Sequence, residues 1–160
     1  MKKNDRPALA IRLLGGFDVR IWGRPVAEAR WSRRQAKQLV KLLALIPRHQ
    51  LHRQQLIDAI CPDLDAEAGA ANLHKIIHLA RHALEPTLKT GARSQFIMTF
   101  EQQVQLRAPG QLWIDVEEFE RRCEGAMLAH RLSVPATQVT QDIQQAMWKL
   151  RTSLGEVETD

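Results

Sequence analysis

Three prolines divide the middle of the chain into three short segments, and each segment has apolar residues at helical spacing. Proline ends a helix because it has no backbone N–H and its ring clashes with the preceding turn. Pro47 and Pro62 stop the first two helices, and Pro86 stops the third. The sequence therefore predicts three helices with short connections, at about residues 31–46, 53–60 and 65–84.

The first and third helices carry the clearest patterns. One face of the first is apolar: Ala36, Leu39, Val40, Leu43 and Ile46. Ser32 and Gln35 have the S-x-x-Q spacing of a capping box at its start. In the third, Asp65 can serve as the N-cap. An apolar stripe follows at spacings of three and four: Leu73, Ile76, Ile77, Ala80 and Leu84. Gly69 weakens this helix by roughly 1 kcal/mol relative to alanine.

Strand patterns flank the three helices. Residues 11–22 predict two short antiparallel strands, followed by a turn at residues 23–25. Residues 96–100 and 104–106 predict a β-hairpin. Strands, three helices and a hairpin in this order predict an α+β fold. We expect a winged helix over residues 9–107, with an N-terminal antiparallel sheet and a C-terminal β-hairpin wing.

Composition changes at residues 108–110, where Ala-Pro-Gly interrupts the pattern. Beyond it, Asp115 can cap a helix whose apolar side has Val116, Phe119, Cys123 and Met127. A second amphipathic helix is expected from about residue 136 to residue 154. The segment 112–155 should therefore be an α-helical hairpin. Two such helices bury little surface alone, so they must pack on the winged helix, on a second copy or on further residues.

The net charge of +5 is divided unevenly along the chain. Residues 1–107 contain 18 Lys and Arg against 9 Asp and Glu, a net charge of +9. Residues 108–160 contain 5 against 9, a net charge of −4. A basic first part indicates a polyanionic partner, most simply nucleic acid, whereas the acidic remainder should have another role.

Five motifs occur in the order found in a known family: LLGGFDV at 13–19, GRPV at 23–26, WSRRQAK at 31–37, ANL at 71–73 and WIDVEEF at 113–119. Over about residues 9–128 the chain resembles antibiotic-pathway regulators of the SARP/AfsR type. The resemblance implies an OmpR/PhoB-like winged helix joined to the start of a bacterial transcriptional activator domain of TPR-like helices. It also implies that the chain is a fragment or a shortened member. His52, Cys61 and Val104 stand where the family usually has Ser, Trp and Tyr.

In a winged helix the third helix enters the major groove of DNA, where Lys reaches guanine and Asn pairs with adenine. We expect base contacts from Lys75 first, flanked by Asn72, His74 and His78. Contacts to phosphates are expected from seven further residues: Arg33, Arg34, Lys37, Arg81, His82, Lys89 and Arg93. The wing around residues 99–103 should lie near the adjacent minor groove. Trp31 and Trp113 are expected to be core residues.

The predicted function is a sequence-specific, DNA-binding transcriptional regulator, most simply an activator. Double-stranded DNA is the expected partner, and the resemblance adds RNA polymerase and a homodimer on direct repeats. The chain has no P-loop, GxSxG or HExxH motif, so we expect neither an enzyme nor a cofactor. Cys61 and Cys123 lack CxxC spacing, and no apolar run is long enough for a membrane span. We expect a cytoplasmic protein that contacts no membrane.

The same residues also permit other uses. His74, His78 and His82 recur every fourth residue and, with Cys61, have spacing that permits a metal site, although acidic or thiolate partners that make zinc motifs specific are missing. Protonation of these histidines would strengthen DNA binding in mildly acidic solution. The alternative from another class is a non-catalytic protein-interaction adaptor, in which the winged helix and helical hairpin bind a protein partner.

Overall fold

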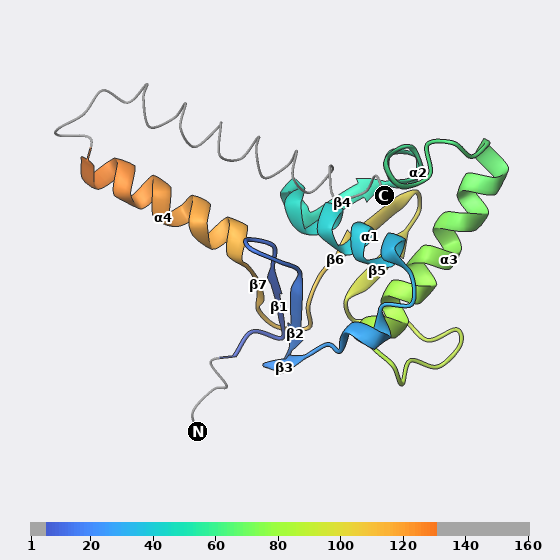
Figure 1. Ribbon diagram of the computed structural model, residues 1–160, viewed down its shortest axis with the longest axis horizontal. Coiled ribbons are helices and arrows are strands. Elements are labelled where there is room, and N and C mark those ends of the chain that lie inside the picture. Colours follow the sequence, from blue (N-terminus) through green and yellow to red (C-terminus); the bar gives the residue numbers. More distant parts are fainter. Residues whose placement is uncertain (1–5, 131–160) are drawn as a thin grey trace. The chain divides into compact units, whose positions relative to one another are not determined.

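A computed structural model describes residues 6–130, and the chain divides into two units, residues 1–114 and 115–160 (Figure 1). The first unit combines three α-helices with two small β-sheets, which confirms the predicted α+β class. Within the described residues, no helix has the length and apolar character to span a membrane.

The first sheet has the strand order β3-β2-β1-β7. It comprises β1 (Leu9–Arg12), β2 (Asp18–Ile21), β3 (Arg24–Pro25) and β7 (Leu112–Ile114). The strands β1 and β2 pair antiparallel, as the sequence predicts. The strand β7 runs parallel to β1, with Ile11 opposite Ile114, and both side chains are buried. Sequence reasoning assigned residues 112–114 to the second segment, because three residues are too few to show an alternating pattern.

The turn between β2 and β3 differs from the prediction of a turn at residues 23–25. It consists of Trp22 and Gly23, which both have positive φ, 51° and 79°. Positive φ at both central residues is typical of a two-residue hairpin turn that matches the twist of its strands. Arg24 and Pro25 therefore belong to a short strand, in which Arg24 pairs with Ile21.

The three predicted helices are confirmed as α1 (Arg34–Leu45), α2 (Arg53–Ile60) and α3 (Ala66–Leu84). The capping box predicted at Ser32 is wrong: the N-cap of α1 is Arg33, and its side chain makes no capping hydrogen bond. A capping box occurs instead at α2, where the His52 side chain accepts from the Gln54 N–H and the Gln55 side chain accepts from the His52 N–H, both at 3.1 Å. The prediction of Asp65 as N-cap of α3 is confirmed.

The core of the first unit lies where α1, α2 and α3 contact one another and the second sheet. The predicted stripe of α3 is buried throughout, from Leu73 to Leu84. Trp31 is also buried, and its ring meets that of Phe17 edge-on at 5.2 Å between centroids. The core role expected for Trp31 is thus confirmed, whereas Trp113 is only half-buried.

The second sheet has the order β4-β6-β5. The predicted hairpin is confirmed as β5 (Ile97–Phe100) and β6 (Gln103–Leu106). The strand β4 (Gln50–His52), which was not predicted, pairs antiparallel with β6. It lies between two helices and has three residues, so its sequence carries no period of its own.

The second unit is described only through α4 (Asp115–His130). Asp115 is the first residue of this helix. Glu118 forms ion pairs with Arg121 and Arg122 one turn later. Hydrogen bonds from Arg121 and then Arg122 hold the pKa of Glu118 below its ordinary value. The second helix predicted for residues 136–154 lies outside the described residues.

Gly69 lies where α3 meets α2, since a Cβ at this position would come within 2.6 Å of Ile57 Cγ2. We expect Gly69→Ala to lower the free energy of unfolding by about 1 kcal/mol, because overpacking outweighs the gain in helix propensity. In an Ile57→Ala background, the same substitution should instead raise it by about 1 kcal/mol, because the opposing methyl group is gone. Urea denaturation of the four proteins measures both effects. A stabilising Gly69→Ala in the wild type contradicts the close packing.

Candidate nucleic-acid interface

The exposed face of α3 changes charge along its length. Its beginning is acidic, with Asp65 as the cap and Glu67 in the first turn. From residue 74 onward the exposed positions are basic or titratable, since His74, Lys75 and His78 are all exposed. Any anionic partner of α3 therefore has to approach its second half, because residues 74–84 contain no Asp or Glu.

A groove of about 540 Å³ borders this second half of α3. Its walls are α3, the loop that follows it and strand β5. Six residues expected to contact DNA line it together: His74, His78, Arg81, His82, Lys89 and Arg93. No Asp or Glu is among the lining residues of this groove. The structure thus gathers side chains from positions 74 to 93 around one surface that is suited to an anion.

The loop wall of this groove is held in place by polar contacts around the buried Ser94. The Glu85 carboxylate accepts hydrogen bonds from the Ser94 hydroxyl and from the Gln95 N–H, the latter at 3.0 Å. Ser94 is 3% exposed, and its oxygen accepts in turn from the N–H groups of Phe96 and Ile97. Lys89 and Arg93 therefore stand on a loop whose two ends are fixed, at α3 and at β5. Sequence reasoning missed Ser94, because a serine in a polar loop carries no distinguishing signal.

Arg81 connects two of the walls of the groove, α3 and β5. Its Nε donates to the carbonyl oxygen of Ile97 at 3.0 Å, and its Nη2 donates to Thr99 Oγ1 at 3.1 Å. Burial lowers the pKa of the Arg81 guanidinium, and the nearby Glu85 opposes that shift. Because two of its donors are used within the protein, Arg81 orients strand β5 relative to α3 as well as contributing positive charge.

The histidines on this face lie close together at one point. The rings of His78 and His82 have centroids 4.3 Å apart, with planes tilted by 59°. His74 lines the same groove one turn earlier.

Cys61, the fourth residue of the metal alternative, is buried and accepts a hydrogen bond from Asn72 Nδ2 at 3.0 Å. Among residues 6–130, no three His, Cys, Asp or Glu side chains converge well enough to hold a metal ion.

The structure does not bring every expected contact residue into this groove. Lys75 is exposed on α3 but does not line it, and Asn72 is half-buried against Cys61. Arg33 and Arg34, at the start of α1, are exposed but do not line the groove, and Lys37 forms an ion pair with Glu28. The expected contact residues therefore fall into three sets: those that line the groove, Lys75 and Asn72 on α3 outside its lining, and those at and near the start of α1.

The tip of the β5–β6 hairpin adds an exposed aromatic ring beside the groove. Phe100 is 43% exposed and is one of its lining residues. The two-residue turn that follows contains Glu101 with a φ of 50°. Exposed aromatic rings contact sugars and bases in nucleic-acid complexes. The strand pattern identified this hairpin, but the exposure of Phe100 could not be predicted from it.

In comparisons with known proteins, no family model, curated protein or solved structure matches the chain.

Proposed function

We propose that this protein is a DNA-binding transcriptional regulator of the SARP/AfsR type and that residues 9–107 form its winged helix. The observation that carries the proposal is the groove between α3, its following loop and β5, lined by six cationic or titratable side chains and by no carboxylate. In a winged helix these elements are the recognition helix and the wing. A phosphate backbone fits the groove while the adjoining α3 lies in the major groove.

In this proposal the residues divide between two tasks. Lys75, exposed on the helix and outside the groove, reads base edges with His74 and His78. Lys89 and Arg93, which stand on the anchored loop, bind phosphates. Asn72 is bonded to Cys61, so it reads a base only after exchanging that contact. Arg33 and Arg34 contact the backbone at the start of α1, where amide groups at a helix N-terminus also favour phosphate.

The acidic second segment supplies the regulatory surface in this proposal. Over residues 115–124, helix α4 carries five carboxylates against Arg121 and Arg122, a net charge of −3. DNA repels such a helix, so it contacts protein instead. In this proposal α4 is the first helix of a TPR-like activator domain in a cytoplasmic regulator. Its partner is RNA polymerase, or a second copy of the protein bound to a direct repeat in the DNA.

Fluorescence anisotropy with labelled random-sequence duplex DNA at several salt concentrations tests the proposal. About six phosphate contacts predict that log affinity falls with log salt with a slope near −5. We expect Lys89→Ala and Arg93→Ala each to reduce the magnitude of that slope by about 1. Arg12→Ala is the matched control, because Arg12 is exposed on β1 and does not line the groove. Failure of the wild type to bind duplex DNA at low salt rejects DNA binding and favours the protein-interaction adaptor.

A further inference from the structure

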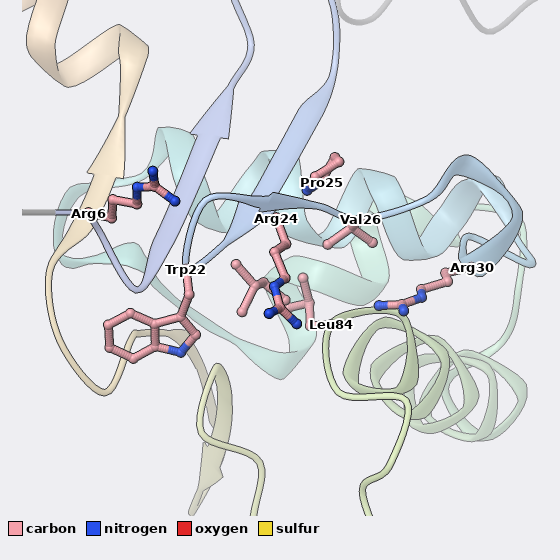
Figure 2. A pocket seen from close by; sticks show the side chains of 8 residues that line it. Arg6, Trp22, Arg24, Pro25, Val26, Arg30 and Leu84 are labelled. Carbon is pink, nitrogen blue, oxygen red and sulfur yellow. The ribbon is translucent and has the colours of Figure 1, made fainter. Parts of the chain in front are cut away.

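A second pocket, of about 720 Å³, lies in the first unit between the β2–β3 hairpin and the last turn of α3 (Figure 2). It shares no lining residue with the groove described above. Its apolar lining comes from the sheet side and from the end of the helix: Ile21, Pro25, Val26 and Leu84. Its polar lining is Arg6, Arg24 and Arg30, and Trp22 completes it.

The three arginines make this pocket strongly cationic. No carboxylate is among its lining residues, and within residues 6–130 no ion pair or side-chain hydrogen bond involves these three guanidinium groups. Two acidic residues close to Arg24 and Arg30 in the sequence are engaged elsewhere, since Asp18 pairs with Arg20 and Glu28 with Lys37. In Figure 2 the ends of Arg24 and Arg30 point toward the same space beside Leu84. Like charges directed at one space repel, and an anion bound between them offsets that repulsion.

Trp22 gives the same pocket an exposed aromatic surface. Its side chain is 45% exposed, and its backbone has a φ of 51°, a conformation that bulky residues rarely adopt. The turn is fixed by the Trp22 N–H, which donates to the carbonyl oxygen of Ala8 at 3.1 Å. The edge of the ring lies near Gly110, where a Cβ would be 3.5 Å from Trp22 Cη2. The hairpin turn therefore holds an exposed indole at a fixed place beside the arginines, where it can contact a ligand.

Together these features define the chemistry of the ligand. Guanidinium groups bind phosphate in a bidentate manner, and an indole ring stacks on a planar base. The volume is within the range of small-ligand sites. We infer that this pocket binds a free mononucleotide, with the base on Trp22 and the phosphate held by Arg24 and Arg30. The inference is independent of DNA binding by α3.

Isothermal titration calorimetry of the full chain with adenosine monophosphate, adenosine and inorganic phosphate tests this inference. We expect the nucleotide to bind at least about tenfold more tightly than either of its two parts, because only the nucleotide engages both the ring and the arginines. Arg24→Gln and Trp22→Asn should each weaken nucleotide binding by about tenfold or more. Asparagine tolerates positive φ, so Trp22→Asn removes the ring without imposing new strain on the turn.

Arg20→Gln is the matched control. Arg20 lies on β2 next to the pocket, is paired with Asp18 and does not line the pocket, so nucleotide affinity should stay within about twofold. Thermal melts establish that each variant is folded. Nucleotide affinity that is unchanged in Trp22→Asn and Arg24→Gln overturns the inference, as does binding of the nucleotide no tighter than that of inorganic phosphate. Trp22-dependent binding of a single-stranded oligonucleotide without binding of the mononucleotide also overturns it.

Discussion

Lys75→Glu is expected to lower the affinity for duplex DNA by about 100-fold at fixed salt. Loss of one good base contact costs about 1–3 kcal/mol. The new carboxylate adds repulsion from neighbouring phosphates, and 1.4 kcal/mol corresponds to a factor of ten. Lys75 is exposed, so the substitution leaves the core intact. Anisotropy titrations of the wild type and the variant in the same buffer measure the ratio.

Arg12→Glu makes the same change of charge at an exposed position of β1 and serves as the control. Both variants lower the net charge of the protein by two, so a non-specific electrostatic effect weakens both equally. A specific role of α3 instead requires that Lys75→Glu weaken binding much more than Arg12→Glu. Equal losses in the two variants show that α3 is not the DNA-contacting element.

Leu73→Ala is expected to lower the free energy of unfolding by about 2–5 kcal/mol and the Tm by about 10 °C or more. Leu73 is 0% exposed and lies on the face of α3 that packs against α1 and α2. Truncating it removes apolar contacts and leaves a cavity that surrounding side chains fill only in part. Thermal melts followed by circular dichroism measure the loss.

The neighbouring His74 provides the control for this experiment. His74 is exposed and lines the groove, so His74→Ala should change stability by less than about 0.5 kcal/mol while it weakens DNA binding. Leu73→Ala, assayed well below its Tm, should bind DNA nearly as the wild type does. A large loss of stability in His74→Ala contradicts the assignment of the two faces of α3.

The sequence alone predicted the elements whose patterns are long enough to show a period. The end of α2 follows from the proline stop at residue 62. The N-cap of α3 follows from Asp65, whose side chain accepts a hydrogen bond from the N–H of Ala68 three residues later. The β5–β6 hairpin follows from two strand patterns around a polar turn. Each of these signals lies within about 20 residues, so no knowledge of the tertiary structure was needed.

Only the tertiary structure revealed β4 and β7, which have three residues each and are defined by strands far away in the chain. A strand of that length has no period of its own, and its hydrogen bonds depend on where its partner lies. The capping box expected at Ser32 is wrong because the N-cap of α1 is the next residue, Arg33.

The candidate sites show the same division. Composition and helical spacing identified basic residues on α3, and these are local properties. The convergence of His74, Arg81, Lys89 and Arg93 on one groove depends on the Glu85–Ser94 contact and on the bonds from Arg81 to β5. The pocket around Trp22 joins residues 6 to 84 and had no signal in the sequence. The sequence thus determined which side chains are present and on which helix face they lie, whereas packing decided which of them share a surface, because that depends on contacts between distant segments.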